Sequence, residues 1–177
     1  MKKSILFFTF FILALHAVAQ YEESESRHFI RVEAGYLKYL ARTVTVKPGA
    51  GWKGYHLPEN ENGMNFNAMW GWDFNESNLL SVGAGYLNFE GIEGADIFTE
   101  IDFMVSNSYV NPYLGLRAGY THLWNQYENG TGSVLAEFIV GLQFRFGMYS
   151  YSSVHLQSGI SFTQQALFIP VRLSYQF

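Results

Sequence analysis

Apolar side chains alternate with polar or small ones along most of this chain, and that period of two limits the folds open to it. The alternation recurs in eight segments of about ten residues that are rich in Tyr, Phe, Val and Trp. Successive side chains of a β-strand point to opposite faces, and these residue types favour strands. The segments are roughly 29–40, 64–74, 79–89, 95–105, 111–122, 133–146, 152–163 and 166–177. An all-β fold is therefore expected.

The two faces of these strands differ in chemistry. One face is apolar, and only Thr99 and Ser158 interrupt it. The opposite face carries acids, amides, Arg and many glycines, but no Lys. In a soluble sandwich the apolar face would be the core and the polar face the surface. Arg without Lys suits enclosed ion pairs, however, and glycine suits an interior too narrow for side chains from every strand.

A transmembrane barrel inverts the usual arrangement, with an apolar exterior and a polar interior, and it accounts for both details. The sequence thus predicts an eight-stranded antiparallel up-and-down transmembrane β-barrel. Connections after even segments look short, whereas those at 41–63, 90–94 and 123–132 look longer or more varied. This pattern places 41–63 and 123–132 outside the cell. Pro170 cannot donate to a ladder hydrogen bond, so we expect it at a bulge or a strand end.

The first residues predict an export signal. Lys2 and Lys3 precede an apolar run that ends at Ala17-Val18-Ala19, the pattern of a cleaved secretory signal peptide. We expect a signal peptide at 1–19, a periplasmic lead-in at 20–28 and the barrel domain at 29–177. Removal of the signal leaves 9 Lys and Arg against 15 Asp and Glu, so nucleic acid is not an expected partner.

Two stretches resemble a known family. The run Asn111 to Tyr120 and the ending Val171-Arg172-Leu173-Ser174-Tyr175-Gln176-Phe177 are similar to those of the small, porin-like outer-membrane β-barrels of Gram-negative bacteria. The resemblance implies an outer-membrane location, lipid contact and recognition by the barrel assembly machinery through the terminal aromatic Phe177. It identifies an architecture and an export route more than a biochemical task.

The expected function is structural or surface-binding, with a plugged lumen. Eight strands leave an interior that side chains fill, whereas an aqueous channel needs about 16 strands. We expect the enclosed charges to form a salt-bridge network that closes the lumen. The network residues are Arg31, Glu33, Glu100, Asp102, Arg117, Glu137, Arg145 and Arg172. A small-solute channel is the first alternative, and we expect a monomer.

A lipid A-modifying enzyme is the second alternative, and it requires a Ser beside a His with a carboxylate or polar orienter. His122 has no Ser two residues away on its face, and Ser158 is opposite in parity to His155, so no catalytic site is expected. The histidines are too scattered for a metal site, and no cofactor is expected. Aromatic residues between the strands are candidates for binding a surface ligand or for an interfacial girdle. They are Trp52, Tyr55, Trp124 and Tyr127.

Overall fold

The computed structural model describes residues 27–43, 61–74, 77–106, 108–124, 131–146 and 152–177. It contains eight strands: β1 (Arg27–Arg42), β2 (Gly63–Asp73), β3 (Asn78–Phe89), β4 (Ile92–Met104), β5 (Val110–Leu123), β6 (Thr131–Arg145), β7 (Ser153–Thr163) and β8 (Ala166–Gln176). The described ranges hold no helix that is long and apolar enough to cross a membrane. The predicted signal peptide lies outside these ranges and stays a prediction.

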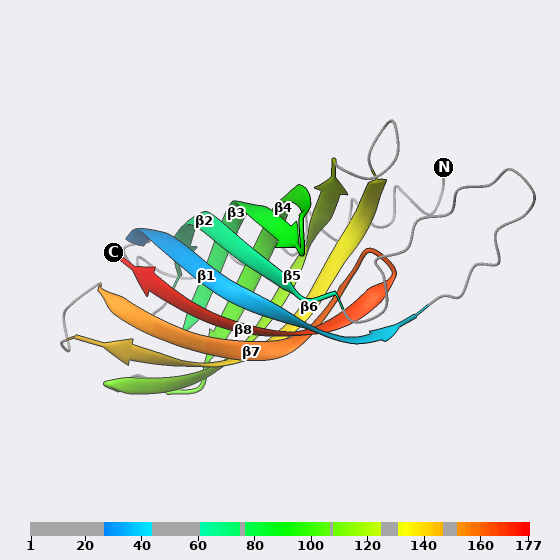
Figure 1. Cartoon of the computed structure of the whole chain (residues 1–177). Helices are drawn as coiled ribbons and strands as arrows, with labels where there is room; N and C mark the ends of the chain where they lie inside the picture. The colour runs from blue at the N-terminus through cyan, green and yellow to red at the C-terminus, as the bar shows by residue number, and fades with distance from the viewer. Residues whose placement is uncertain (1–26, 44–60, 75–76, 107, 125–130, 147–151) are drawn as a thin grey trace, which may run out of the picture.

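The strands form a closed barrel (Figure 1). Each strand pairs antiparallel with the next, and β8 pairs with β1. Ile30 and Phe177 complete the closure, because each donates a backbone hydrogen bond to the other at 3.0 and 2.9 Å. The predicted eight-stranded antiparallel up-and-down barrel is therefore confirmed.

The first strand begins earlier than the sequence indicates. Arg27 pairs with Asp73 and His28 with Trp72, so these two residues belong to β1 and not to the predicted lead-in. The His28 ring also stacks on Trp70 at 5.5 Å between centroids. The alternation did not predict these two paired residues, because charged and polar residues such as Arg and His at a strand end are also common in loops.

Two of the connections are tight hairpins. Glu90 and Gly91 alone join β3 to β4, so the prediction of a longer connection at 90–94 was wrong. Their φ angles are 50° and 101°, and Gln164 and Gln165, which join β7 to β8, have φ of 50° and 59°. Two consecutive residues with positive φ give the hairpin turn whose twist matches that of the flanking strands.

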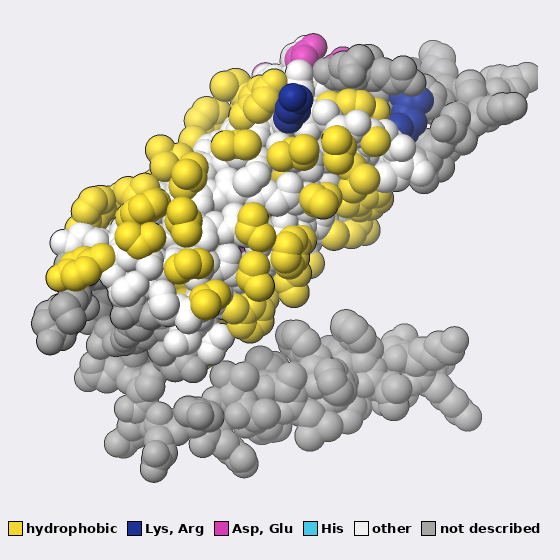
Figure 2. Space-filling view, turned by 90° about the horizontal axis from the view of Figure 1, so that it is seen from below, with side chains coloured by type: hydrophobic (Ala, Val, Ile, Leu, Met, Phe, Trp, Pro, Cys, Tyr) yellow, Lys and Arg dark blue, Asp and Glu magenta, His cyan; other side chains and the backbone are white. Residues whose placement is uncertain are grey.

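The two faces of the strands lie as the alternation predicts. Outward-facing residues include exposed Val32, Trp70, Val82, Leu116 and Val140. Figure 2 shows hydrophobic side chains spread over the visible face of the barrel, with the few charged side chains near one end. The buried residues include 22 polar or charged ones, so the interior is the more polar side of the sheet. This is the arrangement of a transmembrane barrel.

Pro170 lies within β8 and not at its end. The pairing of β7 with β8 runs from Ser153 to Ser158, which pairs with Val171, and resumes only at Ser161 with Phe168. Pro170 lies in this gap, where its missing N–H breaks no ladder bond. The Ser158 hydroxyl donates to the Pro170 carbonyl at 2.7 Å. Ser158, a polar residue on the outer face, therefore bonds to β8 next to the interruption in the pairing.

Candidate functional site

The lumen centres on Arg117, which is fully buried on β5 between two acids. In the sheet register Arg117 is directly opposite Glu100 on β4 and Glu137 on β6. Its guanidinium lies 2.5 Å from Glu100 and 3.6 Å from Glu137. It also reaches across the lumen to Glu33 on β1, at 3.1 Å. One cation thus joins carboxylates from three strands.

Arg31 on β1 makes the second set of ion pairs. Its Nη1 lies 2.9 Å from both Glu100 and Asp102 on β4, on the far side of the lumen. Its Nε and Nη2 donate to Gln176 Oε1 at 3.3 and 3.1 Å. Glu100 therefore links Arg31 to Arg117, and neither arginine side chain is exposed.

Arg172 on β8 completes a connected network. It lies 2.6 Å from Glu137 and 3.4 Å from Glu33. The structure thus brings together seven of the eight predicted residues. Arg145, the eighth, lies at the end of β6, where its Nε donates to Gln143 at 3.2 Å. Sequence parity alone placed Arg145 with the others, because parity gives the face of a strand but not the height along the barrel.

Neutral polar side chains extend the network. Glu33 accepts hydrogen bonds from Asn67 Nδ2 at 2.6 Å and from Gln157 Nε2. Tyr113 in turn donates its hydroxyl to Gln157 Oε1 at 2.5 Å. Such bonds occupy the lone pairs that enclosed carboxylates would otherwise leave without donors. The centre of the lumen is therefore a continuous polar cluster.

Glycines make room for these long side chains. A Cβ at Gly35 would lie 2.5 Å from the Arg172 Cγ, and one at Gly115 would lie 2.6 Å from Asp102 Oδ1. Either contact is closer than a carbon atom allows without displacement. The inward glycines are thus explained by the width of the lumen, as the sequence indicates.

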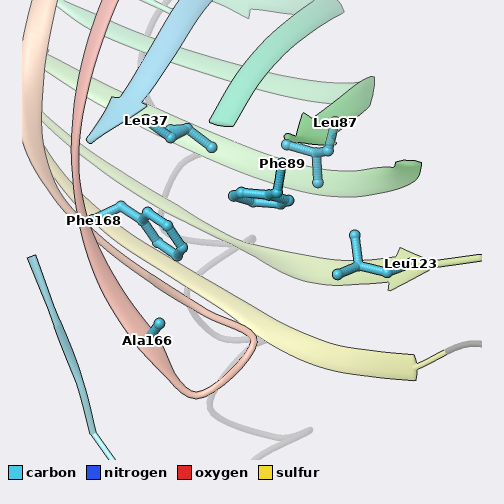
Figure 3. Packing of buried hydrophobic residues seen from close by; sticks show 6 residues of the cluster. All are labelled: Leu37, Leu87, Phe89, Leu123, Ala166 and Phe168. Atoms are coloured by element: carbon cyan, nitrogen blue, oxygen red, sulfur yellow. The ribbon is translucent and has the colours of Figure 1, made fainter. Parts of the chain in front are cut away.

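The lumen also contains buried apolar side chains, which the sequence did not predict. An end cluster of buried Leu37, Leu87, Phe89, Leu123, Ala166 and Phe168 fills one end of the barrel. Figure 3 shows these side chains pointing into the interior from different strands. The Phe89 and Phe168 rings lie 5.3 Å apart. Their parity is that of the polar lumen residues, so the alternation alone does not distinguish an apolar layer at the end of the barrel from the charged layer in its middle.

Further apolar side chains lie deeper inside. Met69, Phe98 and Leu135 form one buried group, and the ring of Phe98 packs 4.1 Å from the Arg117 guanidinium carbon. The other group consists of Phe29, Leu79, Met104, Tyr113 and Ile139. The charged network is therefore enclosed by apolar packing, which strengthens its ion pairs by excluding water.

A Ser–His pair that the sequence analysis missed lies inside the barrel. Ser153 Oγ is 3.0 Å from His155 Nε2, and both side chains are buried. The shared parity of positions 153 and 155 on β7 was the signal that could have revealed it. The His155 Nδ1 has no hydrogen-bond partner among the described residues. Within those residues no group of side chains could hold a metal ion.

Only one candidate loop-binding residue lies within the described ranges. Trp124 directly follows β5, half exposed, and its ring lies 6.3 Å from that of His122. This places Trp124 on the outer wall in line with Tyr120, as a girdle residue would be. Trp52, Tyr55 and Tyr127 lie outside the described residues.

Comparisons with known proteins support the fold. No protein-family model and no curated protein matches the chain. The structure is similar to that of Neisserial surface protein A, with a TM-score of 0.61 and 10% identity over 84% of this chain and 95% of that one. It is also similar to the N-terminal β-barrel domain of Pseudomonas aeruginosa OprF, with a TM-score of 0.54 and 11% identity over 86% and 100%. These neighbours are small outer-membrane β-barrels, and this chain shares their fold.

Proposed function

We propose that this chain is a non-conducting outer-membrane barrel with a structural or surface-presenting role. The observation that carries the proposal is the inversion of its two faces. Large apolar side chains cover the outside, whereas Arg31 and Arg117 are wholly enclosed with their acids. An apolar outer surface of this kind is unfavourable in water and favourable in contact with lipid. Outer-membrane lipid is therefore the partner of the wall.

Closure of the lumen is supported by two barriers in series. The ion-paired network occupies the middle, and the end cluster fills the end where odd strands finish. An ion entering the lumen would have to displace paired charges and then pass packed apolar side chains. Both steps are costly in a low-dielectric interior, which disfavours the small-solute channel.

Planar-bilayer recording tests the closure. The purified protein should insert without stable conductance steps. The Phe89→Ala, Phe168→Ala double variant should add flickering conductance, because the two rings lie against each other in the end cluster. The matched control is Phe66→Ala, which removes an exposed ring on the outer wall and should leave the recording unchanged. Large, stable conductance in the parent would reject the closed lumen and favour the channel.

A lipid A-modifying enzyme is disfavoured by the place of the Ser153–His155 pair. Both residues face the lumen and are buried, so a lipid in the bilayer cannot reach the hydroxyl. Acyl transfer also needs a group that orients the imidazole through Nδ1, and that atom has no partner in the described part of the chain. The pair serves the polar packing of the lumen.

A surface role would rest on the connections at one end of the barrel. The β1–β2 connection spans residues 43–62, and it leaves the same end as the tight β3–β4 and β7–β8 turns. Outer-membrane barrels place their longer loops outside the cell. An epitope inserted in this connection should be labelled on intact cells, and one inserted between β6 and β7 only after permeabilisation. The reverse pattern would show that the orientation is inverted.

A further inference from the structure

Asp96 is an enclosed acid that forms no ion pair with a described residue. It lies on β4, directly opposite Gly85 on β3, which in turn is directly opposite Asn67 on β2. Asp96 is only 6% exposed. The buried atoms Asp96 Oδ1 and Asn67 Oδ1 both have no hydrogen-bond donor among the described residues. Two acceptor oxygens without donors thus occupy one row of the sheet.

The glycine between them brings these oxygens together. A Cβ at Gly85 would meet Asn67 Oδ1 and would lie 2.5 Å from Asp96 Oδ1. Both oxygens therefore converge on the space that the missing side chain leaves. Two oxygens that can only accept repel each other unless a hydrogen-bond donor or a cation lies between them.

The amide of Asn67 cannot turn to supply the missing donor. Its Nδ2 donates to Glu33 Oε1 at 2.6 Å, and it also lies 3.0 Å from the oxygen of Asn65 in the orientation that satisfies that residue. Rotation of the Asn67 amide would direct its oxygen at the Glu33 carboxylate. A proton on the Asp96 carboxyl group supplies the donor that Asn67 Oδ1 lacks.

The charge balance of the lumen agrees. Glu33, Glu100, Asp102 and Glu137 each lie within 4.0 Å of an arginine, whereas Asp96 forms no ion pair with a described residue. The charged groups that act on Asp96 are Glu33 on β1, Arg117 on β5, Glu137 on β6 and Arg172 on β8. These are two anions and two cations, and both cations are already paired.

We propose that Asp96 is a proton-binding site, whose neutral carboxyl group donates its O–H to Asn67 Oδ1 across Gly85. The lumen then holds four acids that are ion-paired with three arginines and one acid that is neutral. Loss of this proton would leave an unpaired carboxylate facing an amide oxygen. A folded state that holds a proton which the unfolded chain releases loses stability as the pH rises. Through this residue the barrel therefore becomes less stable as the pH rises from mildly acidic values.

The test is Asp96→Asn, which places an N–H donor opposite Asn67 at every pH. Unfolding by urea in lipid vesicles is measured from mildly acidic to mildly alkaline pH. The urea midpoint of the parent should fall as the pH rises, and that of D96N should stay constant and exceed the parent's at alkaline pH. The matched control is Glu100→Gln, which should lower the midpoint at every pH because Glu100 accepts from two arginines.

Infrared spectroscopy supplies a readout that does not depend on stability. At mildly acidic pH the parent should show a protonated carboxyl C=O band that D96N lacks, and this difference should disappear as the pH rises. Two outcomes would overturn the proposal. One is a D96N that is destabilised like E100Q, which would make Asp96 a charged acceptor. The other is an infrared difference with no carboxyl band together with sodium-dependent stability, which would place a cation between the oxygens.

Discussion

At the scale of single residues, Arg117 lies between carboxylates on three strands, and its removal is the sharpest test of the network. We expect Arg117→Met to lower the free energy of unfolding by about 3–5 kcal/mol, because it leaves a buried negative charge without compensation. The double variant with Glu100→Gln should lose less, since Arg31 keeps Asp102 and Arg172 keeps the remaining acids. Urea unfolding in lipid measures both. If the losses of the two single variants simply add in the double variant, water in the lumen solvates the charges and the ion pair contributes little.

The partners of each arginine were only partly predictable from the sequence. Arg117 with Glu137 or Glu100 follows from the pairing of neighbouring strands. The contact of Arg31 with Asp102 crosses the lumen between β1 and β4. Such contacts depend on strand tilt and on the stagger of the closed sheet, which alternation does not encode.

Ser158 offers a second prediction at the residue scale, because its hydroxyl is bonded on the lipid side. Ser158→Ala removes the donor to the Pro170 carbonyl, so we expect a loss of about 0.5–1.5 kcal/mol in the free energy of unfolding. Thr99→Ala is the control, since Thr99 is another hydroxyl residue of the outer face and is exposed. Equal effects of the two changes would show that the Ser158 bond contributes nothing.

At the scale of strands and turns, alternation located the eight elements but not the packing inside them. Leu37, Phe89 and Phe168 have inward parity, as the lumen arginines do. The sequence predicted a polar inward face, and these three residues are apolar exceptions to that prediction. A narrow barrel is filled in layers, and each layer can differ in chemistry while the parity stays the same.

The two tight hairpins give a paired prediction. Gln165 is exposed with φ of 59°, a conformation that side chains disfavour by about 1–2 kcal/mol. We expect Gln165→Gly to raise the free energy of unfolding by about 1 kcal/mol, because the backbone oxygen still accepts from Thr43. Gly91→Ala should lower the free energy of unfolding, because a φ of 101° is strained for a residue with a side chain. The added Cβ would meet nothing within 4 Å, so the loss comes from the backbone and not from a clash. A gain in both variants, or a loss in both, would contradict this account of the turns.

At the scale of the whole molecule, Phe177 extends the pairing of β1 with β8 that closes the sheet. Phe177 exchanges two backbone hydrogen bonds with Ile30, and its half-exposed ring lies on the outer wall 5.8 Å from Tyr175. The residue therefore has two separable parts, a backbone that seals β8 against β1 and a terminal ring. The sequence pointed to the ring through its resemblance to an assembly signal. It did not reveal the seal, which exists only once the barrel is closed.

Phe177→Ala separates the two parts, because it keeps the backbone bonds and removes the ring. Refolded from urea into detergent, the variant should lose at most about 1.5–3 kcal/mol, the contribution of a fully buried aromatic side chain. In cells the assembled amount should fall much further, since we propose that the assembly machinery reads the terminal ring. Deletion of Phe177 should add the loss of two hydrogen bonds, at about 1 kcal/mol each, to the detergent result.

The matched control for the cellular measurement is Phe146→Ala. Phe146 is also exposed, and its ring lies 6.3 Å from Tyr175, so it belongs to the same aromatic neighbourhood without being part of the terminal motif. If the ring of Phe177 matters only for lipid contact, the two variants will lower the heat-modifiable barrel on gels to the same extent. If it is read as a signal, Phe177→Ala alone will leave the protein unassembled in cells, although the same protein still folds in detergent.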